Sequence, residues 1–157
     1  MKSYWCIALF ILLSIFGDVL GAPPDTLAVL VKGTGSDARF EPVILQVEPG
    51  DVIRFEVIEG LHTVTAYHPE NRRPLRIPNG VSSFNSGMLK TGDIWFLSLN
   101  EDGVYDYFCL PHERMGHAGR ILVGTKNVSP DYEDKLLLAA VSKILNEAYQ
   151  QFKNQNE

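Results

Sequence analysis

The sequence predicts an all-β domain, either a sandwich or a barrel, followed by one C-terminal α-helix. Between residues 27 and 123, short apolar segments alternate with a period of two. Turn residues recur between these segments at regular intervals, as is typical of sandwiches and barrels. Beyond residue 129 the apolar spacing becomes that of a helix.

The expected strands follow one another along the chain, separated by turns that contain Gly, Asp or Pro. The clearest alternation places Ile53, Phe55 and Val57 on one face of a half-buried strand. The complete set of strand-like segments comprises residues 27–32, 43–47, 51–58, 61–67, 94–99, 104–109 and 119–123.

Residues 68–90 contain many Pro and Gly residues and predict a long irregular loop. Loops of this length are uncommon unless they have a function. Arg72, Arg73 and Arg76 make this loop the most basic stretch of an acidic chain. We consider two interpretations: a solvated loop, or a partner contact near the functional site. His68 is expected to be a loop histidine rather than a ligand.

Residues 130–152 are expected to form one amphipathic helix. Ser129 can cap its N-terminus, and Pro130 suits the first helical position. We expect its apolar face to pack on the β-domain or on a second copy of the chain, which would make a homo-oligomer. The apolar positions are Leu137, Val141, Ile144, Leu145, Ala148 and Phe152.

The first 21 residues have the pattern of a secretory signal peptide. Lys2 precedes an apolar run over residues 6–16, and Gly21 and Ala22 offer a cleavage site. The run is short for a membrane span, so we expect no stable span after cleavage; an uncleaved anchor is the alternative. We therefore expect a periplasmic or secreted protein. Its three parts are the signal peptide (residues 1–21), the β-domain (22–126), and the helix and tail (127–157).

Charge and cysteine content narrow the class of protein. The 157-residue chain has a net charge of −5. Residues 1–21 contain one lysine and one aspartate, so their removal leaves this charge unchanged. An acidic balance argues against nucleic-acid binding. Cys109 is the single cysteine after residue 21 and cannot form an intramolecular disulfide. Metal ligation explains why an exported protein would keep such a thiol.

The most informative segment is Cys109-Leu-Pro-His112-Glu-Arg-Met115-Gly-His117. It places histidine, methionine and histidine at +3, +6 and +8 from the cysteine, and His62 lies upstream in a strand-like segment. One thiolate and two imidazoles are the ligands of mononuclear copper electron-transfer sites, which usually add a weak ligand such as methionine. The sequence therefore predicts one mononuclear copper ion.

Each candidate ligand also has a simpler interpretation. Cys109 can be an ordinary buried thiol, and His62 a core histidine. His117 can point to solvent, which leaves a three-coordinate metal or Met115 as the fourth ligand. Structural zinc is disfavoured because paired cysteines are absent. A cysteine protease is disfavoured because a short β-domain does not supply the surroundings that acyl transfer to a cysteine requires.

Residues 103–124 carry a resemblance to the plastocyanin and pseudoazurin branch of the cupredoxins that extends over roughly residues 27–124. In that family a strand ends in the cysteine ligand, Pro-His follows, and methionine lies at +8. The resemblance implies a cupredoxin-like Greek-key β-sandwich whose copper-binding domain is residues 22–126. It also implies that Cys109 is the thiolate ligand, with His112 and His62 as the imidazole ligands.

The fourth ligand departs from the family pattern. The +8 position is His117, and Met115 matches a loop residue that is not usually a ligand. Imidazole is a harder and stronger donor than thioether. A coordinating His117 would therefore favour Cu(II), lower the reduction potential and draw the site towards tetragonal geometry. An exposed His117 would be protonated in mild acid, and its proton would compete with the metal.

Three functions fit these residues. We rank first an electron-transfer protein, rather than an enzyme, that carries one electron between redox partner proteins. It needs an apolar patch around His112, for which Leu61, Leu110, Pro111 and Ala118 are candidates. The alternatives are a copper-binding protein for copper handling, and a small red-copper-like protein with an open coordination position.

Overall fold

The computed structural model describes residues 25–124 and 137–156. Ten strands come first and one α-helix, α1 (Ala139–Asn156), comes last. The strands are β1 (Thr26–Lys32), β2 (Arg39–Glu41), β3 (Ile44–Val47), β4 (Val52–Val57), β5 (Leu61–His62), β6 (Thr65–Ala66), β7 (Leu89–Lys90), β8 (Ile94–Ser98), β9 (Gly103–Phe108) and β10 (Ala118–Val123).

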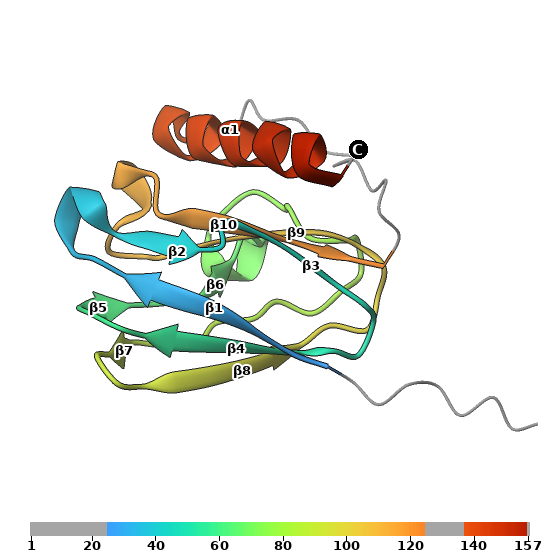
Figure 1. Ribbon diagram of the computed structural model, residues 1–157, viewed down its shortest axis with the longest axis horizontal. Coiled ribbons are helices and arrows are strands. Elements are labelled where there is room, and N and C mark those ends of the chain that lie inside the picture. Colours follow the sequence, from blue (N-terminus) through green and yellow to red (C-terminus); the bar gives the residue numbers. More distant parts are fainter. Residues whose placement is uncertain (1–24, 125–136, 157) are drawn as a thin grey trace, which may run out of the picture.

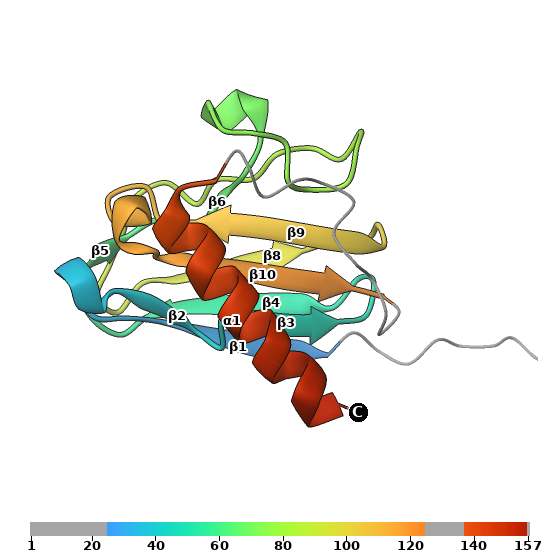
Figure 2. The same ribbon diagram turned by 90° about the horizontal axis from the view of Figure 1, so that it is seen from above.

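The strands form two packed four-stranded sheets, with α1 lying across the outer face of one of them (Figures 1 and 2). One sheet has the order β2-β1-β4-β8, the other has the order β3-β10-β9-β6, and β5 pairs with β7. β1 and β4 are parallel, as are β3 and β10. Parallel neighbours require the chain to cross over between them. The predicted all-β Greek-key sandwich with a C-terminal helix is confirmed.

Strand β4 shows why alternation in the sequence predicted a half-buried strand. Ile53, Phe55 and Val57 are buried between the two sheets. Arg54 and Glu56 lie on the opposite face and form a 2.7 Å ion pair. The period of two therefore reports which face of this sheet is in the core.

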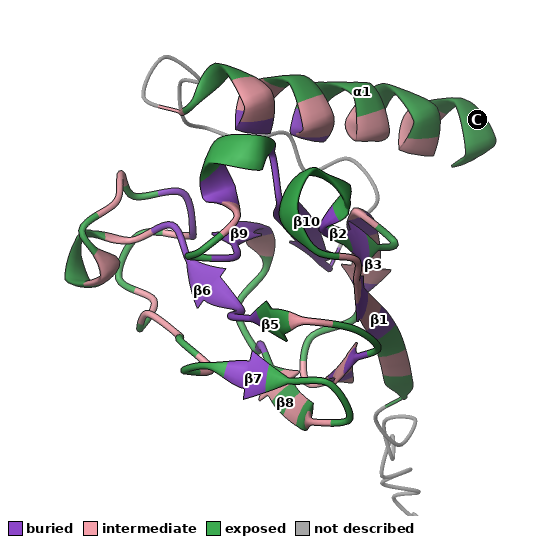
Figure 3. Ribbon diagram, turned by 90° about the vertical axis from the view of Figure 1, so that its left-hand side faces the viewer, coloured by how far each residue is buried: buried purple, intermediate pink, exposed green. Residues whose placement is uncertain are grey.

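Strand β10 is buried along its whole length because α1 covers its outer face. Val141 and Leu145 of the helix pack with Phe108 and Ala118 of the sheet. In Figure 3 the side of α1 towards the sandwich is buried and its outer side is exposed. The apolar face of the helix thus packs on the β-domain of its own chain, the first of the two expected packings, the other being on a second copy.

The helix bounds differ from the predicted residues 130–152. α1 begins at Ala139 and ends at Asn156, and residues 137 and 138 are not helical. Leu137 still packs with the buried helix residues, so apolar spacing alone does not separate this segment from the helix. The predicted cap at residues 129–130 and the signal peptide at residues 1–21 lie outside the described residues. Within the described parts of the chain, no helix has the length and apolar character needed to cross a membrane.

Two of the three arginines in the loop at residues 68–90 point into the protein. Arg76 is buried and pairs with Asp106 at 2.9 Å. Arg73 pairs with Glu113 at 2.6 Å. Arg72 is exposed. The loop is therefore held against the domain by two ion pairs and is not fully solvated, and a partner contact near the functional site stays a prediction.

Candidate metal centre

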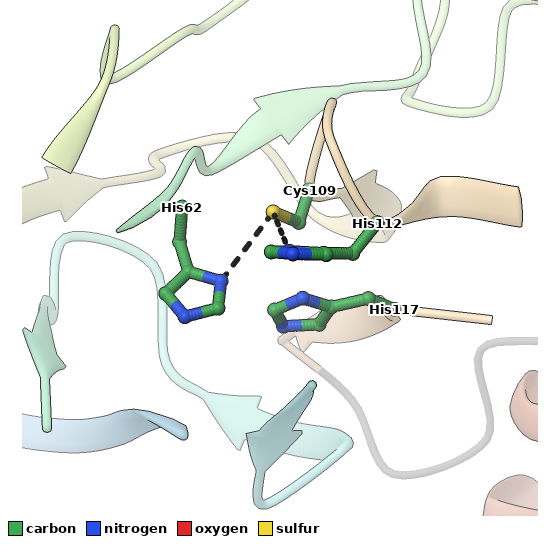
Figure 4. Close-up of side chains that lie close together, drawn as sticks. All are labelled: His62, Cys109, His112 and His117. Carbon is green, nitrogen blue, oxygen red and sulfur yellow. Dashed lines mark hydrogen bonds between the residues drawn. The ribbon is translucent and has the colours of Figure 1, made fainter. Parts of the chain in front are cut away.

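Four side chains meet at one end of the sandwich (Figure 4). His62 ends β5, Cys109 directly follows β9, and His112 and His117 lie in the turn between β9 and β10. Their ligand atoms all lie within 4.8 Å of one another. Figure 3 looks onto this end of the domain. The fold therefore brings together the four residues that the sequence singled out.

The Cys109 sulfur lies close to two of the three histidines (Figure 4). Its Sγ atom is 3.6 Å from Nδ1 of His62 and 3.4 Å from Nδ1 of His112. The backbone N–H of Thr63 donates to the sulfur at 3.4 Å. Burial raises the pKa of the Cys109 thiol to about 11. A thiol with a raised pKa stays protonated when no cation is bound. A metal cation deprotonates a thiol that coordinates it, so a bound cation would stabilise the thiolate form of Cys109.

A backbone hydrogen bond fixes the tautomer of His62. Its Nε2 atom lies 2.7 Å from the carbonyl oxygen of Glu59. A carbonyl can only accept, so Nε2 carries the proton and donates it. This leaves the lone pair of Nδ1 facing Cys109. Ligating histidines commonly have such a partner on the second nitrogen, which holds the ring in the orientation that binding needs.

His117 is 1% exposed, and neither ring nitrogen has a hydrogen-bond partner. Burial, followed by the nearby His62 and His112, lowers the pKa of His117 to about 3. An unpartnered buried nitrogen is costly, and a metal ion would satisfy one of the two. The donor set and this unpartnered imidazole fit a copper ion. The alternative in which His117 points to solvent is therefore wrong.

The other two candidates lie elsewhere. Met115 is in the short 3-10 helix η3 (Glu113–Met115) and is 43% exposed. His68 lies outside the cluster and caps a second 3-10 helix, η2 (Pro69–Asn71), where its Nδ1 accepts the Glu70 N–H at 3.2 Å. His68 is thus a loop histidine, as expected. Of the two candidates for a fourth ligand, His117 is the one buried among the other three residues.

Exposed apolar residues lie close to the candidate ligands in the sequence, and His112 is the least buried of the four. Leu61 and Leu110 are 57% and 52% exposed. Ala118 was predicted to join them but is buried under α1. Met88 was not predicted; it is 57% exposed and precedes the residue of β7 that pairs with His62. Leu61, Leu110 and Met88 thus place three exposed apolar side chains next to residues of the site in the sequence or in the strand pairing.

The structure shows two supporting residues, Thr63 and Phe40, to which the sequence analysis assigned no role in the site. The Thr63 hydroxyl accepts the N–H of Leu110 at 2.9 Å, which ties the His62 strand to the cysteine turn. The Phe40 ring lies 4.0 Å from the His117 ring, centroid to centroid. Phe40 belongs to β2, whose three residues are too few to give a periodic signal. Thr63 adjoins His62 in the sequence, and that position was the available signal.

Comparisons with known proteins agree with this site. Residues 27–124 match the family described as copper binding proteins, plastocyanin/azurin family. A pseudoazurin from Paracoccus pantotrophus is 36% identical over 96 residues, which are 61% of this chain and 60% of that protein. A plastocyanin from Ginkgo biloba is 31% identical over 98 residues, 60% of this chain and 97% of that one.

This chain matches only part of the length of the pseudoazurins. It spans 60% of the Paracoccus protein and 63% of a putative pseudoazurin from Rhizobium leguminosarum bv. viciae. The solved structure of a purple cupredoxin from Nitrosopumilus maritimus superposes with a TM-score of 0.50 at 21% identity. That alignment covers 62% of this chain and 99% of the other, and it supports the fold.

Proposed function

The chain belongs to the plastocyanin/azurin family of copper-binding proteins, and from this premise we propose that it is an exported one-electron carrier with a modified type 1 copper site. The observation that carries the proposal is the His62, Cys109, His112 and His117 cluster, whose ligand atoms lie within 4.8 Å of one another. We assign the Cys109 sulfur and Nδ1 of His62 and His112 as three ligands. We assign His117, in preference to Met115, as the fourth.

When bound, copper supplies one-electron exchange between its Cu(I) and Cu(II) forms. The protein supplies a site that changes little between them. His62 is held by the Glu59 carbonyl, and the cysteine turn is held to the His62 strand by Thr63. Rigid ligands reduce the reorganisation that slows electron exchange. His112 is the least buried of the four residues, and we propose it as the route from the buried site to a redox partner.

A copper titration of the chain tests this function. One equivalent of Cu(II) should produce an intense thiolate-to-copper absorption, with electron self-exchange that NMR line broadening detects, and azide should leave the spectrum unchanged. Ready loss of copper to a mild chelator together with poor self-exchange would support a copper-handling protein instead. A spectrum altered by azide would support an open coordination position.

Export is inferred from the pattern of residues 1–21. The N-terminal residue of protein recovered from an expressing cell tests it, and Ala22 is expected. Recovery of a chain that still begins at Met1 would contradict cleavage.

Leu61→Glu should slow electron self-exchange by about tenfold or more, because two like charges would meet where the apolar patches of two copies touch. The absorption spectrum should not change, since Leu61 is 57% exposed and its side chain is not a ligand. Phe96→Glu is the matched control. Phe96 is also 57% exposed but lies on β8, on the outer face of the other sheet. Equal slowing of electron self-exchange in Leu61→Glu and Phe96→Glu would argue against the surface around Leu61 as the contact between two copies.

Gly60→Ala should weaken copper binding by about 10–100-fold, the usual cost of disturbing a residue behind a ligand. A Cβ atom at this position would lie 2.8 Å from Nε2 of His62. The φ angle of Gly60 is +95°, so alanine is also strained there. Gly80→Ala is the control, because its φ is +83° and its Cβ would contact nothing within 4 Å. Competition with a chelator measures both affinities, and equal affinities would contradict the role of Gly60.

A further inference from the structure

We propose that helix α1 sets the position of the fourth ligand, with Ile144 as a positioning residue for His117. This inference rests on the four-ligand site proposed above. The helix follows the family domain, which ends at residue 124. Its proposed effect on the copper site therefore comes from a segment outside the matched residues 27–124.

The helix touches the backbone immediately before the ligand. Gly116 precedes His117 and has a φ angle of +88°. A Cβ atom on Gly116 would lie 3.1 Å from the carbonyl oxygen of Ala140 and 3.1 Å from Cγ1 of Ile144. Both residues belong to the first turns of α1. The turn that carries His117 thus packs closely against the helix at Gly116.

The His117 ring is placed by packing and by the backbone around it. Its nitrogens have no hydrogen-bond partner in the protein, in contrast to His62. Its carbonyl oxygen accepts the Cys109 N–H at 3.0 Å, and the Phe40 ring lies 4.0 Å from its own. A ring without polar partners takes its position from what its backbone rests on. The Ile144 contact is one such support.

The turn has room to move if this support is shortened. A cavity of about 450 Å³ adjoins the contact and is lined by Phe40, Met115, Gly116 and Ile144, among others. Truncation of Ile144 would enlarge this space beside Gly116. The turn that carries His117 would then lose part of its support, and we expect the His117 ring to shift relative to Cys109 and His62.

Ile144→Ala in the full chain tests the inference. The thiolate absorption bands and the Cu(II) EPR spectrum should shift in the direction that His117→Met shifts them, and the reduction potential should rise. Phe152→Ala is the matched control on the same helix. It lies eight residues further on, about 12 Å along the axis, and packs with Ile44 and Leu122. It should lower stability and leave the spectrum unchanged.

A second readout needs no metal. In the copper-free protein, the NMR resonances of the His117 ring should move in Ile144→Ala and stay in place in Phe152→Ala. If Ile144→Ala does not fold, Ile144→Val should give a smaller shift of the same sign. Equal spectra for Ile144→Ala and the parent, with a shifted His117→Met spectrum, would overturn the inference and leave the proposed function intact. Equal shifts in Ile144→Ala and Phe152→Ala would also overturn it, because general loosening would explain both. An unshifted His117→Met spectrum would refute the fourth ligand itself.

Discussion

Cys109→Ser should abolish the intense thiolate-to-copper charge-transfer absorption completely. Cys109 is the free cysteine of the described residues and supplies the single sulfur of the four-residue cluster. A serine hydroxyl is a hard, poorly ionised donor that gives no such transition and holds copper more weakly. Absorption and EPR spectra at matched copper loading measure the effect.

The same variant should remain folded, because serine is close to cysteine in size and Thr63 can still donate its N–H to the hydroxyl oxygen. Far-ultraviolet circular dichroism checks this. His68→Ser is the control: His68 caps η2 outside the cluster, and its replacement should leave the band intact. Survival of the band in Cys109→Ser would show that the proposed thiolate ligand is wrong.

His117→Met should make the Cu(II) site bluer and raise its reduction potential. Imidazole is the harder donor and stabilises Cu(II) selectively, so its replacement by a thioether favours Cu(I). As the axial bond weakens, the bond from copper to the Cys109 sulfur should strengthen. The variant should keep one copper per chain, because Cys109, His62 and His112 are unchanged. Potentiometry and EPR measure the two effects.

Met115→Leu is the matched control for the fourth ligand. Met115 is the competing candidate and is 43% exposed in η3. Its replacement should leave spectrum and potential unchanged. If Met115→Leu shifts both while His117→Met shifts neither at full copper loading, Met115 rather than His117 is the fourth ligand.

The longer strands were predictable because alternation needs several residues to be visible. β4 repeats its buried positions three times, and the sequence located it within one residue at each end. β5 and β6 lie within the expected segment 61–67, which the structure divides into two short strands. β2 and β7 have only three and two residues, too few for a period, and β7 is defined by its pairing with β5, as of Leu89 with His62, which local sequence does not specify.

The sequence by itself predicted Cys109 and His112 as donors, because a cysteine and a histidine three residues apart in one turn can reach a common metal. It also predicted an all-β domain, since alternating segments must bury one face, while the choice of a sandwich over a barrel came from the family resemblance. Only the tertiary structure decided that His117 is buried and unpartnered, and that Arg73 and Arg76 are tied inwards. The exposure of a turn residue depends on which distant segments pack on it. Here Phe40 of β2 packs on the His117 ring, and α1 packs on Gly116.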